Sequence, residues 1–215
     1  MTPNNIVGMA QVLELSILAV SDHNTALQLP AIEKLAREAG ILFVPGIEIS
    51  TAEEAHILSL FPDVPSALAM GEEVYAALPP VKNRPEIFGN QFILDENDEK
   101  VGELDKLLIN ATTLSISEVF QRVRAHGGVP VPAHIDKNAY SVIASLGMIP
   151  PELGVKAVEI SDSGRQKGYR PPKGVFVLND SDAHCLDTMC DHEAGEIELE
   201  RWSVRALLEL LRGEG

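Results

Sequence analysis

The sequence has few basic residues and few cysteines. It contains 17 lysines and arginines against 32 aspartates and glutamates, and its formal net charge is −15. A chain so acidic is poorly suited to displace counterions from nucleic-acid phosphates or from anionic lipids, so stable binding to nucleic acid or to a membrane is not expected. Two cysteines, Cys185 and Cys190, are too few for a disulfide framework, which favours a reducing cytoplasm.

The sequence also lacks a long apolar run. Its apolar stretches are interrupted after a few residues, whereas a helix needs roughly 20 apolar residues to cross a bilayer. At 215 residues, with 45% hydrophobic and 23% charged residues, the composition is that of a globular protein with one sizeable core. One domain covering residues 1–215 is therefore expected.

Strand and helix patterns alternate along the chain. Apolar runs predict strands at residues 16–20, 41–44, 56–61, 129–134, 155–160 and 174–178. Helical spacing begins near Thr2 and recurs at residues 25–38, 65–78, 115–125, 138–146 and 203–211. A charged turn predicts a solvated β-hairpin excursion near 91–104. This order favours an α/β fold with a parallel sheet, and the lack of a Gly-rich phosphate loop favours a barrel-like arrangement over a nucleotide-binding sheet.

Histidines and carboxylates stand near the ends of these predicted strands, where parallel sheets and barrels place their sites. Imidazole nitrogens suit zinc-like ions, and a carboxylate can bridge two cations. Glu48 lies two positions beyond Gly46. Because glycine has no side chain, we expect Gly46 to leave space beside Glu48. Two cations about 3.5–4 Å apart stabilise an in-line displacement at phosphorus. The candidate ligands are His23, Glu48, His56, His134, Asp182 and His184.

Each of these residues has an ordinary structural alternative, such as a salt bridge or a hydrogen bond in the core. Their joint occurrence favours a metal site, because burying so many polar groups without an ion would be costly. His126 is instead expected to interact with helix carbonyls, and His192 lies in an acidic loop. A rival zinc site would use His184, Cys185, Cys190 and His192, although this spacing matches no zinc ribbon or finger.

Basic residues are scarce, and the sequence does not choose which of them contacts a substrate phosphate. The candidates are Lys82, Arg84, Lys137, Arg165, Lys167, Arg170 and Lys173.

The ordered set of motifs resembles the polymerase and histidinol phosphatase (PHP) family of metal-dependent phosphoesterases, in particular its small stand-alone bacterial members. The motifs are Ser-Asp-His-Asn at 21–24, Pro-Gly-Ile-Glu-Ile-Ser at 45–50, His-Ile-Leu at 56–58, Pro-Ala-His at 132–134, Val-Glu-Ile-Ser at 158–161 and Ser-Asp-Ala-His at 181–184. The resemblance implies a distorted TIM-like (β/α)7 barrel. It also implies two or three divalent ions, zinc, manganese or iron, in a cleft at the strand C-termini.

The resemblance further implies roles for the site residues. Glu48 would bridge two ions, His56 and His134 would hold one ion with it, and Asp182 would help to hold a second. His23 and His184 would hold a third ion. Asp22 would orient the ligands, and the catalytic set would be Asp22, Glu48, His134 and Asp182.

One family feature is absent from this sequence. Family members begin with a strand that carries a His-x-His motif, which should precede the segment Thr2–Ile6. The resemblance therefore predicts a barrel without its first strand, in which the second ion keeps only Glu48 and Asp182. Weaker metal binding and exposed strand edges are the expected consequences.

Three functions follow from these observations. The first is metal-dependent hydrolysis of a small phosphomonoester or nucleotide by metal-activated water. The alternative is an N-terminally truncated, catalytically impaired metal-binding or regulatory module. A third possibility, a subunit that proofreads or repairs DNA, lacks the support of a basic groove.

Overall fold

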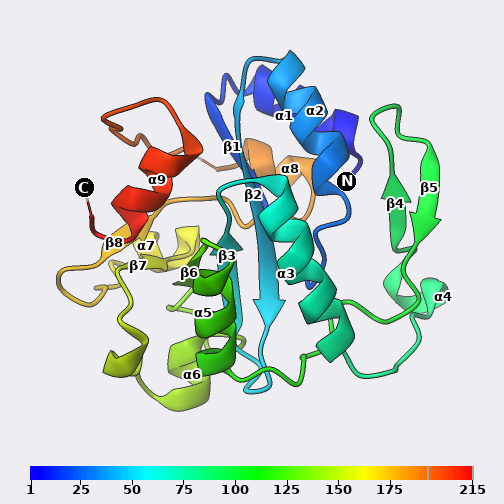
Figure 1. Cartoon of the computed structure of the whole chain (residues 1–215). Coiled ribbons are helices and arrows are strands. Elements are labelled where there is room, and N and C mark those ends of the chain that lie inside the picture. The colour runs from blue at the N-terminus through cyan, green and yellow to red at the C-terminus, as the bar shows by residue number, and fades with distance from the viewer. Residues whose placement is uncertain (193, 215) are drawn as a thin grey trace.

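The structure, a computed structural model, describes residues 1–192 and 194–214. A four-stranded sheet runs through the middle of the molecule, in the order β1-β2-β3-β6 (Figure 1). Its strands are β1 (Ile17–Val20), β2 (Leu42–Ser50), β3 (His56–Leu60) and β6 (Val129–Pro132). The mixed α/β class predicted from the sequence is confirmed.

The sheet is mixed rather than parallel, which corrects the sequence prediction. β1 and β2 run parallel, but β3 is antiparallel to both of its neighbours, β2 and β6. The direction of β3 reverses because the chain turns directly from Ser50 to His56, so that these two residues face each other across the strands. An antiparallel neighbour needs only such a short connection, whereas a parallel one needs a long crossover.

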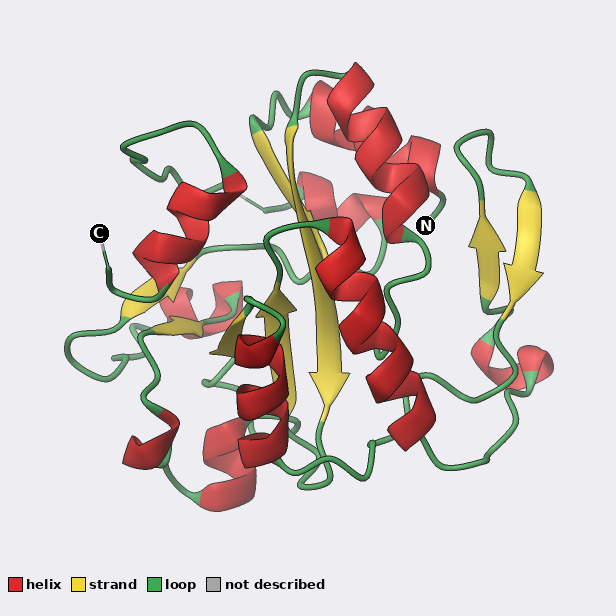
Figure 2. Ribbon diagram, in the orientation of Figure 1, coloured by secondary structure: helices red, strands yellow, loops and turns green. Residues whose placement is uncertain are grey.

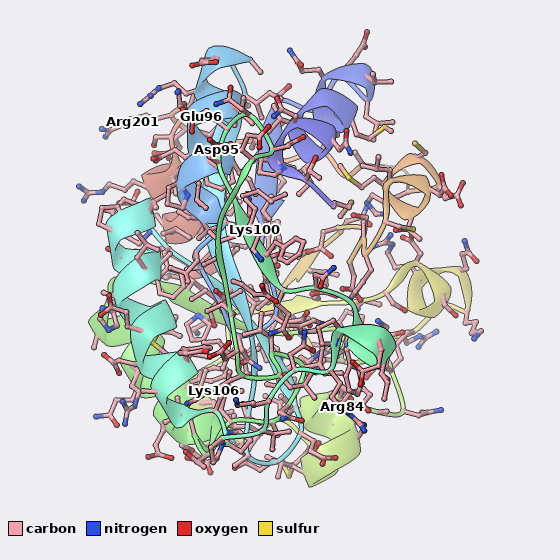
Figure 3. All side chains as sticks on the ribbon, turned by 90° about the vertical axis from the view of Figure 1, so that its right-hand side faces the viewer. Arg84, Asp95, Glu96, Lys100, Lys106 and Arg201 are labelled. Carbon is pink, nitrogen blue, oxygen red and sulfur yellow. The ribbon has the colours of Figure 1, made fainter. Side chains whose placement is uncertain are left out.

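Two further pairs of strands lie outside this sheet. β7 (Ala157–Glu159) and β8 (Phe176–Leu178) are parallel, and β4 (Phe92–Leu94) and β5 (Lys100–Glu103) form the predicted hairpin. Figure 3 looks onto this hairpin, with Asp95 and Glu96 in its turn. Among the described residues, hydrogen bonds join the strands into these three separate sheets, so the closed barrel expected from the resemblance is not confirmed.

Helices cover the sheet and fill the connections (Figure 2). The longer ones are α1 (Pro3–Val12), α2 (Leu29–Glu38), α3 (Val64–Ala77), α5 (Ile116–Ala125) and α9 (Val204–Leu211). Short helices are α4 (Pro85–Phe88), α6 (Val142–Leu146), α7 (Asp162–Gln166), α8 (Leu186–Cys190) and the 3₁₀-helix Pro151–Leu153. No helix within the described ranges is long and apolar enough to cross a membrane.

Two helices begin later than the sequence predicted, each for a local reason. α2 begins at Leu29 rather than at 25, because Asn24 has a left-handed backbone (φ 53°) and the chain turns there. α6 begins at Val142 rather than at 138, because Ser141 caps it and Tyr140 is left-handed (φ 58°). By contrast, the predicted capping box of Ser115 and Glu118 is present at the start of α5.

The sheet separates two apolar cores. Alternate residues of β2 and β3, including Phe43, Ile47 and Ile57, pack with α1, α2, α3 and α5. The intervening residues Val44 and Leu58 face the other way and pack with β6, β7, β8 and α9. Because side chains alternate along a strand, Glu48 and His56 share the face of Val44 and Leu58.

A glycine contact fixes the approach of β6 to β3. A Cβ atom on Gly128 would lie 2.8 Å from the carbonyl oxygen of Leu60 and 2.9 Å from Val123 Cγ1. Gly8, inside α1, has open space at the same position. The two glycines therefore offer a matched pair of substitutions.

We expect Gly128→Ala to lower the free energy of unfolding by about 1–3 kcal/mol, because backbone must move to admit the methyl group. Gly8→Ala should raise it by about 0.5–1 kcal/mol, because alanine favours the helix. Urea denaturation measures both values. A Gly128→Ala variant as stable as the wild type would contradict the described packing of β6 on β3.

Candidate metal centre

Glu48 is the centre of a group of imidazoles. Its side chain is buried, with the residue 7% exposed. One carboxylate oxygen, Oε1, lies 3.0 Å from Nδ1 of His56 and 3.3 Å from Nε2 of His134, and Oε2 lies 3.4 Å from Nδ1 of His23. The sheet thus gathers one carboxylate and three histidines from four separate segments of the chain.

The strands explain how these side chains meet. Glu48 lies inside β2, which extends to Ser50, and not after a strand ending at 44 as the sequence predicted. His23 follows β1 and forms a parallel bridge with Glu48. His56 is the first residue of β3, and the antiparallel direction brings this end beside the C-terminal part of β2. His56 therefore reaches the site from the N-terminal end of its strand, not from a C-terminal end.

Gly46 has a different role from the one expected. A Cβ atom there would lie 3.1 Å from Leu60 Cδ2, from Ser21 Cβ and from the carbonyl oxygen of Val20. The glycine allows β1 and β3 to approach β2 closely, and the space beside it is already filled.

His134 depends on a bend in the backbone. Val131 and Ala133 pack in the core with Val44, so a continued strand would turn His134 to the opposite face. The chain leaves the extended conformation at His134, whose φ is 30°, and the imidazole comes beside Glu48. Non-glycine residues adopt positive φ rarely, and such residues cluster at functional sites.

Asn24 holds His23 in place, a role that sequence analysis missed. Asn24 is fully buried, and its side chain donates to the carbonyl oxygens of Leu108 (2.7 Å) and Asn110 (3.0 Å) and accepts from the Ser50 amide (3.0 Å). Its own amide donates to the Glu48 carbonyl oxygen. Asparagine tolerates the left-handed backbone needed here, which was the signal available within the Ser-Asp-His-Asn motif.

The electrostatics keep Glu48 charged and His23 neutral. Burial alone would raise the pKa of the Glu48 carboxyl, but hydrogen bonds from His134 and His56 outweigh it, so this pKa lies well below its usual range. Burial lowers the pKa of His23, despite the opposing charge of Glu48. An ionised carboxylate beside a neutral imidazole is the protonation state that metal ligands require.

The donor set fits a divalent ion. Ligand atoms of His23, Glu48 and His56 all lie within 4.8 Å of one another. Bonds of about 2.0–2.2 Å to a tetrahedral ion place neighbouring ligand atoms roughly 3.3–3.6 Å apart, close to the separations around Glu48. In addition, the buried Nδ1 atoms of His23 and His134 have no hydrogen-bond partner within the described residues.

Asp182 and His184 lie at the rim of this group. The His184 ring centroid is 5.6 Å from that of His23, but its side chain is 65% exposed and its Nδ1 is bonded to the Asp182 carbonyl oxygen. The carboxylate of Asp182 accepts a hydrogen bond of 2.7 Å from Lys137 Nζ. Within the described chain, the compact group consists of His23, Glu48 and His56, and it includes neither Asp182 nor His184.

Asp22 touches the centre through its backbone. Its carbonyl oxygen accepts a hydrogen bond from the Glu48 amide, and burial raises the pKa of its carboxyl group.

Two further carboxyl groups, which sequence analysis did not select, lie near Asp182. Glu159 is buried and its Oε1 has no hydrogen-bond partner among the described atoms. Burial, together with the charges of Asp180, Asp182 and Glu48, raises the pKa of Glu159 well above its ordinary value. Burial and Asp182 raise the pKa of Asp180 to about 6. The Val-Glu-Ile-Ser motif at the end of a strand was the available signal for Glu159.

The rival zinc site is not assembled. His192 contacts Asp162 at 3.0 Å, Cys190 Sγ lies 3.4 Å from Met9 Sδ, and Cys185 bonds to Thr188. Both cysteines are free and exposed.

His126 also lies outside the metal centre. Its Nε2 contacts the Glu73 carboxylate at 2.9 Å, so its ring has a charged partner on α3 rather than the expected helix carbonyls.

We expect Asn24→Ala to lower the free energy of unfolding by about 2–4 kcal/mol, because it leaves buried backbone groups unpaired and strains a left-handed position. Manganese affinity should fall as well, since His23 loses its anchor. Asn97→Ala, in the exposed hairpin turn, should change stability by no more than about 0.5 kcal/mol. Equal stability of the two variants in urea denaturation would contradict the anchoring role.

No protein-family model and no curated protein matches this sequence. Among solved structures, Endonuclease Q in complex with a 27-mer duplex substrate bearing an abasic lesion has a TM-score of 0.63 at 14% identity. The lesion-specific endonuclease EndoQ from Pyrococcus furiosus has a TM-score of 0.65 at 18% identity. Each similarity covers 100% of this chain but 52% of the endonuclease, so the chain spans about half of their length.

A third structure is similar over most of both chains. It is a protein from Bifidobacterium adolescentis assigned as a metal-dependent phosphoesterase, with a TM-score of 0.59 and 19% identity over 97% of this chain and 90% of that one. At these identities the similarities establish the fold. The chain therefore has a PHP-like fold, in agreement with the ordered motifs of its sequence.

Proposed function

We propose that this protein hydrolyses phosphate esters with divalent metal ions bound around Glu48. The observation that carries the proposal is the buried Glu48 carboxylate in contact with the imidazoles of His23, His56 and His134. The fold shared with a protein assigned as a metal-dependent phosphoesterase supports the same reaction class. A small phosphomonoester or nucleotide is the proposed substrate, since the net charge of −15 disfavours a long polyanion.

The proposed ligands divide between two or three ions, of zinc, manganese or iron. Glu48 would be shared by two ions, His56 and His134 would hold one of them with it, Asp182 would help to hold the second, and His23 and His184 would hold a third. Asp22 orients the Glu48 segment through its backbone hydrogen bond. Such ions, when bound, activate water and stabilise the charge that develops on the phosphoryl oxygens.

The residues of this chain prepare the site for that chemistry. The low pKa of Glu48 keeps it available as an anionic ligand, and Nδ1 of the neutral His23 makes no hydrogen bond within the described residues. Leu58 and Val131 are buried in the apolar core on the same face of the sheet as Glu48. Hydrolysis then joins a water oxygen to phosphorus, breaks the bond from phosphorus to the ester oxygen, and gives a proton to the departing oxygen.

The proposal includes the architecture and compartment. We propose one domain, with β1, β2, β3, β6, β7 and β8 as part of a TIM-like barrel wall of the PHP type. The hydrogen bond from the Ile135 amide to the Glu159 carbonyl oxygen supports this, because it links the end of β6 to β7. Two free, exposed cysteines are consistent with a reducing cytoplasm.

Two specific observations favour other functions. Two of the similar folds belong to Endonuclease Q proteins, which makes a phosphodiester in DNA the second candidate substrate. Among the described residues the compact ligand group contains three members, and Asp182 is engaged with Lys137, which favours the one-ion binding or regulatory module.

Glu48→Gln tests the proposal, because it keeps the shape of the side chain and removes its charge. We expect manganese affinity, measured by calorimetry, and hydrolysis of p-nitrophenyl phosphate to fall at least about 100-fold. Glu152→Gln, on the exposed 3₁₀-helix, is the matched control and should behave as the wild type.

These measurements, together with an assay on abasic duplex DNA, separate the three functions. Metal binding that survives Glu48→Gln removes Glu48 from the centre. Wild-type protein that binds manganese but hydrolyses no ester is the regulatory module. Cleavage of abasic duplex DNA at a rate above that of all small esters favours the second candidate substrate.

A further inference from the structure

Residues 135–141, which lie between β6 and α6, are held in place by several hydrogen bonds, one of which comes from the candidate ligand His56. The Asp136 carboxylate accepts hydrogen bonds from the Ser161 amide (2.8 Å) and hydroxyl (2.6 Å). The Ser141 hydroxyl donates to the Lys137 carbonyl oxygen, and the His56 amide donates to that of Tyr140. The side chains of this segment are therefore placed by fixed backbone, as a binding site requires.

Lys137 places its ammonium group beside Asp182, at the rim of the candidate metal centre. Its Nζ lies 2.7 Å from Asp182 Oδ2, and its side chain is 43% exposed, so it is open to a ligand. Of the seven basic residues considered from the sequence, it is the one with a described contact to a candidate metal ligand.

Tyr140 lies beside His56, at the edge of the candidate metal centre. Its ring stacks on the His56 imidazole, with centroids 5.1 Å apart and an interplanar angle of 21°. The residue is 56% exposed and has a left-handed backbone, with φ 58°. An exposed aromatic ring held at a strained position beside a candidate ligand is a feature of sites rather than of cores.

Tyr140 also lines an open hollow of about 520 Å³. That volume lies within the range of roughly 300–1,000 Å³ that small-molecule sites occupy. Asn138 and Ser145 offer hydrogen bonds there, while Glu53 and Glu54 contribute carboxylates, and no basic side chain is among its described lining residues. The hollow therefore suits a neutral polar group and repels an additional anionic group.

We propose that residues 135–141 recognise the substrate, with Lys137 binding its phosphoryl group and Tyr140 stacking on a planar leaving group. This inference rests on the proposed phosphoester hydrolysis and adds the substrate class: a phosphomonoester of an aromatic or heteroaromatic alcohol without a second anionic group. Stacking on an aromatic platform tolerates many rings, so the proposal names a class and not one compound.

Three esters that each release a primary alkoxide, but differ in the ring attached to it, test Tyr140 in the manganese-loaded full chain. They are benzyl phosphate, cyclohexylmethyl phosphate, which lacks a planar ring, and 4-carboxybenzyl phosphate, which adds a charge. We expect kcat/KM for benzyl phosphate to exceed the other two by about tenfold. Tyr140→Leu should remove the preference for benzyl over cyclohexylmethyl phosphate, and Tyr140→Phe should keep it. Phe88→Leu, an exposed aromatic on α4, is the control.

Lys137 is tested by the binding of inorganic phosphate to the same manganese-loaded protein. Lys137→Met should weaken phosphate binding about tenfold or more, because a charge-assisted hydrogen bond is lost. Manganese affinity should stay equal or rise, since a competing cation leaves Asp182. Lys137→Arg should recover part of the phosphate affinity, and Lys173→Met, an exposed lysine before β8, should have no effect.

The outcomes separate this inference from the function on which it rests. Hydrolysis without discrimination among the three esters, or Tyr140 and Lys137 variants equal to their controls, would overturn the inference and leave phosphoester hydrolysis standing. A metal-loaded wild type that hydrolyses none of the esters and binds no phosphate would overturn both.

Discussion

The structure depends on a carboxylate buried inside a sheet. An isolated charge in such a place costs several kcal/mol, so Glu48 requires partners, and it has three imidazoles. The contacts between Glu48 and these imidazoles go together with unusual backbone conformations in the surrounding chain. Asn24, His134, Tyr140 and Asp182 all adopt positive φ, and each lies in or next to the segments that surround Glu48. The packing of the two cores holds these unfavourable conformations, which the local sequence alone would not select.

The second constraint is an excess of negative charge beside Glu48. Glu159, Asp180 and Asp182 gather there, and the Lys137 ammonium group lies 2.7 Å from the Asp182 carboxylate. Divalent ions would neutralise the same carboxylates more fully, which would release the lysine for an incoming phosphoryl group. The same group of carboxylates therefore underlies both proposals: divalent ions would neutralise it, and Lys137 would then be available to the substrate.

Sequence analysis identified the α/β class, most elements and the three ligand-type residues of the compact group, because these follow from apolar periodicity and residue chemistry. It misjudged β3, since a short apolar run carries no information about strand direction. It did not find Asn24 as an anchor or Tyr140 as a neighbour of His56, because both depend on left-handed backbone positions and on contacts distant in sequence. Lys137 could not be chosen among seven basic residues until Asp182 was placed beside it.

The most direct test of the account is anomalous diffraction from crystals grown with manganese or zinc, recorded on both sides of the metal absorption edge. The account predicts a strong peak within about 2.0–2.3 Å of a Glu48 carboxylate oxygen and of at least one nitrogen of His23, His56 or His134. Crystals that show no peak there, with Glu48 still paired directly to the imidazoles, would contradict the central claim.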